Sequence, residues 1–311
     1  MRQSLRRVAM QRNITLILCY HRIAEDVEDP FYLRVHPNNF AAHLEEIARW
    51  REPSTLSNLS VSSPRPRVVV TFDDGYRDNL DVALPIAEAK GIPITVFITS
   101  GMLGDRNGFW WDRLAALLRA RPRGTSEFSI EMGGSSVKVP VGGGNLESDL
   151  RVVRRHLLPL PVQEIERVLD AVSLQWSVAS TVSPEALPLT REEFRQLAAA
   201  ELVTIGAHTV DHVRLGDRSS EEQLTTIATS KKELEQLLDR RVRHFAYPFG
   251  RRDDFDDDTV DAVRLANFET ACTTLPGNAD PSTDRYRLPR RLVMNWGRAR
   301  FRAQLQRWRL G

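Results

Sequence analysis

Apolar runs of strand length alternate with amphipathic, helix-like segments along most of the chain. The runs lie at residues 14–20, 68–72, 93–98, 202–206, 242–247, 268–273 and 291–294. Between most of them apolar residues repeat at helical spacing, as Phe40, Leu44 and Ile47 do. Strands that alternate with helices predict an α/β fold with a parallel sheet. Seven such strands fit an irregular (β/α) barrel, in which a functional site would lie at the carboxyl ends of the strands.

A capping box marks the start of the longest predicted helix. Ser219 is followed three residues later by Glu222, so each side chain can bond the backbone N–H of the other residue. We therefore expect a long helix that continues through Leu238.

The composition is that of an ordinary soluble globular protein. Of 311 residues, 27% are charged and 41% are hydrophobic, and the formal net charge is +2. This small charge gives no general case for nucleic-acid binding, and no RNP, zinc-finger or helix-turn-helix signature occurs. Cys19 and Cys272 lie in apolar, strand-like contexts without CxxC spacing. We expect two buried thiols rather than a disulfide or a metal pair.

The first residues do not predict a membrane segment. Residues 1–13 are basic, and the apolar run 14–20 that follows is too short to span a bilayer. No small-residue cleavage site precedes that run. We therefore expect a cytoplasmic protein.

Paired carboxylates follow one predicted strand, and paired imidazoles follow another. Asp73 and Asp74 come directly after a valine-rich run, where adjacent carboxylates are costly unless something neutralises them. Their side chains diverge there, so one can bind a cation while the other stays free for proton transfer. His208 and His212 follow the run 202–206 in the same way. Two imidazoles and one carboxylate form a three-ligand set with open positions, as a catalytic metal needs.

These segments together resemble the polysaccharide deacetylase family, the NodB-homology or carbohydrate esterase 4 group. The chain carries TFDDG at 71–75, an H-[ST]-x-x-H motif at 208–212 and a Pro-aromatic-Gly loop within 245–250. Residues 19–22 resemble the YHR segment near the start of many members. Each motif alone also fits a turn, a helix cap or a solvated loop, but the ordered set is specific. The resemblance implies a NodB-like barrel and a metal-dependent N-deacetylase.

The resemblance also implies a role for each motif residue. Asp74, His208 and His212 would hold one divalent metal ion, most commonly zinc for such a set. The metal would lower the pKa of the attacking water and polarise the acetamide carbonyl. Asp73 would be the general base that takes the proton of that water.

The loop after the run 242–247 would complete the site. Its family counterpart offers a backbone N–H to the developing oxyanion, which here would be the N–H of Phe249. Tyr247 and Phe249 would form an apolar wall against the acetyl methyl, and Pro248 would help to fix the turn. The alternative is that both aromatic rings belong to the core at the barrel rim.

The first departure from the family pattern concerns an arginine. Members with an Arg-Pro-Pro-Tyr-Gly loop use its Arg to orient the base carboxylate, and Ala246 occupies that place here. Arg290 or Arg291, at the start of the last predicted strand, would substitute. We prefer Arg290, the alternative being a surface arginine.

The second departure concerns the general acid. Many members donate the leaving-group proton from a His in a late Leu-His motif, but all seven histidines here lie at or before His244. His21, at the end of the first predicted strand, is the best remaining imidazole. A structural histidine bonded to Asp74 or to backbone is the alternative.

The stretch between the two metal motifs is long for this family, and most of the excess lies within residues 101–190. Alternating residues at 128–132 and 137–141, around a Gly-Gly-Ser-Ser turn, predict a β-hairpin. Helical patterns flank the hairpin at 111–121, 150–157 and 162–174. We interpret 1–311 as a single catalytic domain with 101–190 as a cap-like inserted subdomain, extra scaffold being the other purpose that stays open.

The C-terminal segment 296–309 is basic and helix-like. Phe301, Leu305 and Trp308 share one face, and five arginines crowd the remainder. Such a helix most often packs its apolar face on the barrel and leaves the arginines solvated. The alternative is peripheral contact with an anionic membrane.

The predicted function is removal of an N-acetyl group from an amino sugar in a glycan, a glycan precursor or a lipid-linked saccharide. Another amidohydrolase of the same fold, such as a deformylase or a cyclic-amide hydrolase, is an alternative because the motifs fix water activation and not the acyl group. A saccharide-binding barrel without activity is a further alternative, although a pure binder has no need of the base at Asp73.

Overall fold

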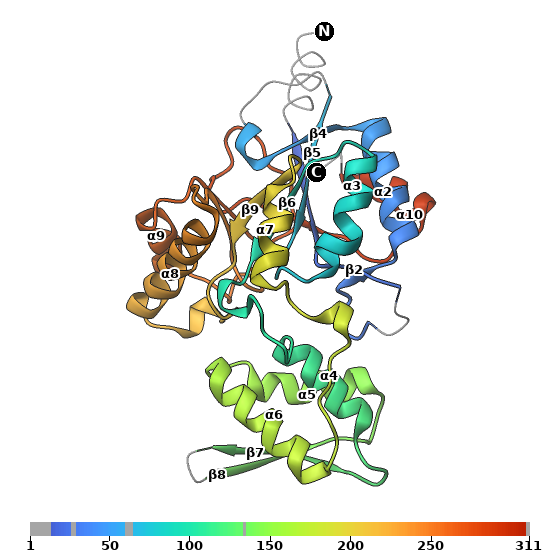
Figure 1. Ribbon diagram of the computed structural model, residues 1–311, viewed down its shortest axis with the longest axis vertical. Coiled ribbons are helices and arrows are strands. Elements are labelled where there is room, and N and C mark those ends of the chain that lie inside the picture. Colours follow the sequence, from blue (N-terminus) through green and yellow to red (C-terminus); the bar gives the residue numbers. More distant parts are fainter. Residues whose placement is uncertain (1–13, 26–28, 60–64, 133–134, 309–311) are drawn as a thin grey trace. The chain divides into compact units, whose positions relative to one another are not determined.

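The chain divides into two compact units. The computed structural model describes residues 14–25, 29–59, 65–132 and 135–308. One unit comprises residues 1–103 and 189–311, and the other comprises 104–188 (Figure 1). The predicted basic segment 1–13 lies outside the described residues.

One parallel sheet forms the centre of the first unit. In spatial order its strands are β11 (Thr270–Cys272), β10 (His244–Ala246), β9 (Val203–Ala207), β6 (Ile94–Ile98), β5 (Arg67–Phe72), β1 (Thr15–Tyr20) and β12 (Arg291–Leu292). These seven strands curl into a half-barrel, which confirms the predicted α/β fold. A short additional strand, β4 (Glu52–Ser54), pairs with the start of β5. Sequence analysis missed β4 because Glu-Pro-Ser carries no apolar pattern.

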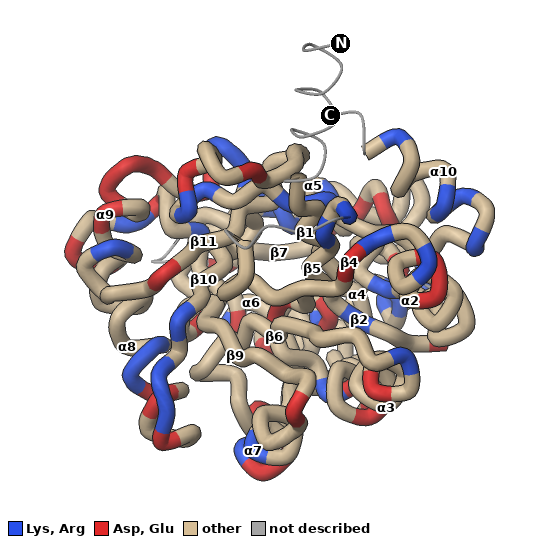
Figure 2. Tube along the Cα trace, turned by 90° about the horizontal axis from the view of Figure 1, so that it is seen from above, with Lys and Arg blue, Asp and Glu red and all other residues tan. Residues whose placement is uncertain are grey.

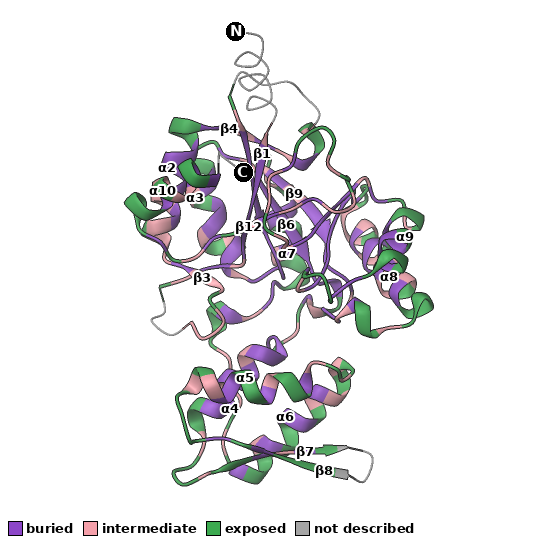
Figure 3. Ribbon diagram, turned by 180° about the vertical axis from the view of Figure 1, so that it is seen from behind, coloured by how far each residue is buried: buried purple, intermediate pink, exposed green. Residues whose placement is uncertain are grey.

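The sheet is covered on both faces. Every residue of β1, β5 and β6 is buried, as expected of a parallel sheet packed between helices. Figure 3 shows these buried strands between two groups of helices. One group contains α2 (Pro37–Trp50), α3 (Leu84–Ala89) and α10 (Arg298–Trp308), and the other contains α8 (Ser220–Leu238) and α9 (Asp257–Leu265).

Capping boxes start three of the helices. The box at Ser219 and Glu222 forms in both directions and confirms the predicted start of α8. Thr190 starts α7 (Arg191–Ala199) in the same way, and Asp256 starts α9. Sequence analysis missed α7 and α9, although these caps were the signal for them.

Helix α10 packs its apolar face inside the first unit. Phe301, Leu305 and Trp308 are buried, and α10 lies against α2. Its Arg298 and Arg302 pair with acidic residues of α2, and Figure 2 shows basic residues along α10 beside the acidic residues of α2. The burial favours the packed interpretation, and membrane contact through residues 296–309 stays an untested prediction. Among the described residues, no helix is long and apolar enough to cross a membrane.

The second unit contains the predicted hairpin and helices. Strands β7 (Glu127–Met132) and β8 (Ser135–Pro140) pair antiparallel, and residues 133–134 of the predicted turn lie outside the described residues. The helices are α4 (Trp110–Ala120), α5 (Leu146–Leu157) and α6 (Val162–Trp176). Arg113 of α4 forms ion pairs with Glu166 and Asp170 of α6. The purpose of this unit as a cap stays a prediction.

Candidate active site

The site residues gather where the central strands end. Asp73 and Asp74 follow β5, His208 follows β9, and Tyr247 follows β10. His21 directly follows β1. Since the strands are parallel, their carboxyl ends meet at one edge of the sheet, which is where α/β proteins place ligands.

The structure brings the predicted metal ligands together. Nε2 of His212 lies 3.3 Å from Asp74 Oδ1, and Nε2 of His208 lies 3.6 Å from the same oxygen. One ligand atom from each residue lies within 4.8 Å of the other two, and all three residues are buried. A single small cation between them could contact all three side chains.

The donor set fits a divalent metal. His208 Nδ1 lies 2.7 Å from the Ala246 carbonyl oxygen, which can only accept, so Nδ1 carries the hydrogen and Nε2 presents a lone pair. Burial lowers the pKa of His208 to about 4, which keeps the ring neutral near pH 7. Asp74 Oδ1 is buried and has no hydrogen-bond partner among the described residues. A buried carboxylate oxygen without a hydrogen bond is costly unless a cation neutralises it.

Strained backbone surrounds this set. Asp74, Thr209, His212 and Phe249 all have φ between +55° and +76°, the left-handed region that non-glycine residues rarely adopt. Thr209 Oγ1 accepts a hydrogen bond from the His212 N–H at 3.0 Å and so holds part of this conformation. Such residues cost on the order of 1–3 kcal/mol each and cluster at functional sites. Two of these strained residues, Asp74 and His212, are predicted metal ligands.

Asp73, unlike Asp74, has protein hydrogen-bond donors on both carboxylate oxygens, and Arg290 supplies them. The guanidinium binds both carboxylate oxygens at 2.6 Å. Arg290 is fully buried and also donates to the Thr273 carbonyl at 2.9 Å and to Thr71 Oγ1 at 3.1 Å. Burial alone would raise the pKa of Asp73, but the Arg290 charge and hydrogen bonds keep that pKa well below its usual range. The structure therefore places Arg290, rather than its neighbour Arg291, on the predicted base.

Both cysteines are free and buried, as predicted. Sequence analysis missed that Cys19 Sγ lies 3.4 Å from Asp73 Oδ2, in position to donate a hydrogen bond. Burial raises the pKa of Cys19 well above its usual value, so the thiol keeps its hydrogen. Nothing in the spacing of Cys19, Thr71 and Thr273 signalled that they surround Arg290 and Asp73.

His21 lies beside the predicted base. One ring nitrogen, Cys19 Sγ and an Asp73 oxygen all lie within 4.8 Å of one another. The ring Nδ1 is buried and has no hydrogen-bond partner among the described residues. Asn79 Nδ2 donates to the His21 carbonyl at 2.9 Å, so the backbone of this residue is fixed. The position suits proton transfer, and the role of His21 as the acid stays a prediction.

The two aromatic residues of the loop after β10 differ. The half-buried Phe249 ring contacts the His212 ring edge-on, with centroids 4.7 Å apart, so the Phe249 backbone lies at the site. Tyr247 is fully buried, stacks on Phe255 at 4.3 Å and donates its hydroxyl to the Tyr286 carbonyl at 2.8 Å. These contacts favour the core interpretation for Tyr247. Pro248 is buried, and its carbonyl accepts a hydrogen bond from the Gly250 N–H at 2.6 Å.

Comparisons with known proteins agree with this fold. The family model for polysaccharide deacetylase matches residues 60–127 and 163–271, more than half of the chain. The chain is 21% identical over 281 residues to the Bacillus subtilis (strain 168) protein named "Putative polysaccharide deacetylase YxkH", covering 88% of this chain and 69% of that one. The chain belongs to the polysaccharide deacetylase family.

Solved structures share the fold. The Streptococcus pyogenes deacetylase PplD in complex with acetate superposes with a TM-score of 0.60 at 19% identity, covering 95% of this chain and 97% of that one. IcaB from Ammonifex degensii gives a TM-score of 0.58 at 17% identity, covering 96% and 97% respectively. At these identities the likeness concerns the fold alone.

Proposed function

We propose that the protein is a metal-dependent hydrolase that removes an N-acetyl group from an amino sugar of a glycan, a glycan precursor or a lipid-linked saccharide. The observation that carries this proposal is the contrast between two adjacent carboxylates. Asp74 lies against two imidazoles, whereas Asp73 is bound by an arginine and lies near a third imidazole, His21. Amide hydrolysis needs these two functions side by side.

Asp74, His208 and His212 would hold the metal ion, most commonly zinc for this donor set. When bound, a divalent ion lowers the pKa of a water and polarises a carbonyl oxygen. The His208 tautomer is already set by the Ala246 carbonyl, so its Nε2 is available as a ligand.

Asp73 would take the proton of the attacking water. Its two oxygens both bind Arg290, which fixes the plane of the carboxylate. Oδ2 also faces the Cys19 thiol, whereas Oδ1 accepts from Arg290 and keeps a second lone pair that can accept a proton. Arg290 therefore positions the base and keeps it ionised.

Two further groups would act on the departing fragments. The His21 ring, close to Asp73, would protonate the amine that leaves. The backbone N–H of Phe249, whose ring lies against His212, would donate to the developing oxyanion. We further propose that the protein is located in the cytoplasm and that its substrate is a saccharide.

Acetate release tests the function. The purified chain, loaded with zinc, is assayed on N-acetylated oligosaccharides and nucleotide-sugars. Formylated amines and cyclic amides are assayed in parallel as alternative substrates. We expect acetate from at least one N-acetylated saccharide, and none after chelation. Release of formate or ring opening without any acetate would mean that the protein is another kind of amidohydrolase. Glycan binding without turnover would mean that it is a saccharide-binding barrel without activity.

A further inference from the structure

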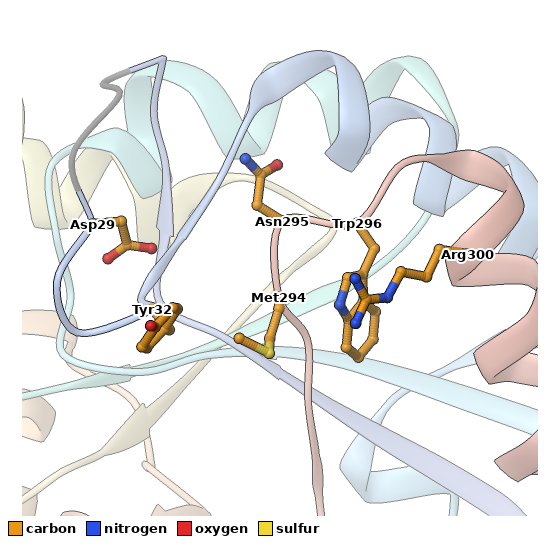
Figure 4. Close-up of a pocket in the computed structure, with 6 residues that line it drawn as sticks. All are labelled: Asp29, Tyr32, Met294, Asn295, Trp296 and Arg300. Carbon is orange, nitrogen blue, oxygen red and sulfur yellow. The ribbon is translucent and has the colours of Figure 1, made fainter.

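A small open pocket lies at the carboxyl end of β12. It has a volume of about 200 Å³. Its lining residues are Asp29, Tyr32, Met294, Asn295, Trp296 and Arg300 (Figure 4). They come from the loop between β2 (Arg22–Ile23) and β3 (Arg34–Val35) and from the segment between β12 and α10. None of them takes part in the site described above.

The pocket and the site share one edge of the sheet. Strand β12 pairs in parallel with β1, with Leu292 opposite Cys19, and the Val293 N–H donates to the Cys19 carbonyl at 3.0 Å. Met294 of the pocket and His21 of the site each lie two residues beyond this pair, just past the ends of their strands. Because neighbouring strands lie about 4.8 Å apart, the two chain segments leave the sheet side by side, and the pocket is next to the His21 side of the site.

Tyr32 combines an unfavourable backbone conformation with an exposed side chain. Its φ is +57°, which is a rare outlier for a bulky residue, and the side chain is 49% exposed. The Tyr32 N–H donates to the Asp29 carbonyl at 3.2 Å, and the Asp29 carboxylate accepts from the N–H groups of Leu33 and Arg34 at 2.9 and 2.8 Å. These hydrogen bonds fix the backbone on both sides of Tyr32, and strained backbone of this kind is typical of ligand-binding sites.

The polar groups of the pocket are placed around an apolar floor. The Arg300 guanidinium lies over the Trp296 ring at 5.5 Å, and Figure 4 shows Asp29 at the opposite end with Met294 between them. Asn295 Oδ1 accepts two hydrogen bonds, from the His36 N–H at 3.0 Å and from an Asn39 amide at 2.6 Å. Its Nδ2 has no hydrogen-bond partner among the residues that the structure describes.

We propose that this pocket is a subsite for one further pyranose unit of the glycan, bound beside the unit that is deacetylated. The proposal rests on the proposed function. The C–H face of a sugar ring would stack on Tyr32, while its hydroxyl and acetamide groups would meet Asn295 and Arg300. The volume lies below the roughly 300–1,000 Å³ of pockets for drug-sized ligands, so it suits a single ring. The Asp29 carboxylate disfavours a polyanion.

The test compares substrates that differ only in length. Acetate release is measured on the dimer, trimer and tetramer of β-1,4-linked N-acetylglucosamine, and the ratio of kcat/KM for tetramer over dimer is the readout. We expect Tyr32→Asn, which keeps the left-handed backbone accessible, to lower this ratio by about 3- to 10-fold. Tyr32→Phe should retain the wild-type ratio because the ring remains.

Two matched controls separate the pocket from general surface effects. Trp50 is a similarly exposed aromatic residue outside the pocket, at 47%, and Trp50→Asn should not change the ratio. Arg300→Gln should lower the ratio, whereas Arg307→Gln on the same helix should not. A wild-type ratio near one, or an unchanged ratio in both Tyr32→Asn and Arg300→Gln, would overturn the subsite while leaving the deacetylase proposal standing.

Binding gives a second readout that needs no turnover. The same oligomers are titrated by calorimetry into Asp73→Asn and into Asp73→Asn with Tyr32→Asn. Selective weakening of the tetramer supports the subsite even if the wild type releases no acetate, in which case only the proposed function fails. Failure of every oligomer to bind would overturn the subsite.

Discussion

Asp73 and Asp74 are neighbours in the chain, yet the fold gives them opposite surroundings. Both carboxylate oxygens of Asp73 accept hydrogen bonds from Arg290, and one of them lies next to the Cys19 thiol. Asp74 has a left-handed backbone and a buried oxygen with no hydrogen bond among the described residues, 3.3 Å from the His212 ring. Asp73 thus has hydrogen-bond partners on both oxygens without any ligand, whereas Asp74, in the described part of the chain, does not. Identical side chains therefore gain different chemistry from their partners alone, and each prediction below tests one side of this contrast.

The largest effect should come from the Asp74 side. His208→Ala or His212→Ala removes one of three predicted ligands, so both bound metal and turnover should be lost. Metal content is measured by elemental analysis together with acetate release. His156→Ala, an exposed histidine of the second unit, is the control and should change neither. A metal-free variant with wild-type activity would refute the ligand assignment.

The next effect should come from the Asp73 side. Asp73→Asn keeps the shape and removes the proton affinity, so we expect the rate to fall by roughly 10²–10⁴-fold while the metal stays bound. Rate and metal content are measured on the same preparation. If metal is lost together with activity, Asp73 is a ligand and the roles of the pair must be exchanged.

His21 should show its effect only where the leaving group needs a proton. His21→Ala should slow an acetamide substrate by on the order of 10²-fold or more, and an activated aryl ester far less. The two rates are compared for variant and wild type at one pH. Equal losses on both substrates would mean that His21 orients other groups instead of donating a proton.

Arg290→Lys should give the smallest loss, together with a shift in pH dependence. Lys cannot bind both Asp73 oxygens in the same plane, so we expect a rate loss of about 10-fold. Arg290 lowers the pKa of Asp73, so the variant should have a higher Asp73 pKa, and the acid limb of kcat/KM should move to higher pH. The pH profile measures this shift.

The same substitution has a consequence for stability. A carboxyl group whose pKa is lowered by folding contributes stability above its unfolded pKa, and this stability is lost as pH falls through the folded value. Arg290→Lys should therefore lower the free energy of unfolding near neutral pH, with less difference from wild type in strong acid. Arg291→Lys is the matched control, since Arg291 contacts Asn278 and the Trp308 ring rather than Asp73. A profile unchanged by Arg290→Lys would show that the ion pair does not tune the base.

The reach of sequence analysis differed between elements. Long apolar runs identified the seven main strands, because burial on both faces demands consecutive apolar residues. The hairpin of the second unit was equally clear from its alternation. Strand β4 was missed because a three-residue polar strand has no periodicity. Helices α7 and α9 were missed although the capping boxes at Thr190 and Asp256 signalled them.

The sequence by itself determined where the main strands lie along the chain and which motifs follow them, because strand formation and turn chemistry depend on neighbouring residues. Only the tertiary structure decided which distant groups meet. Asp73 and Arg290 are 217 positions apart, and nothing local distinguishes Arg290 from Arg291. In the fold, Arg290 points inward and binds Asp73. Tyr247 lies in the core, where its hydroxyl donates a hydrogen bond to the Tyr286 carbonyl. Such contacts depend on how strands pack side by side, and a pattern read along one strand does not contain that information.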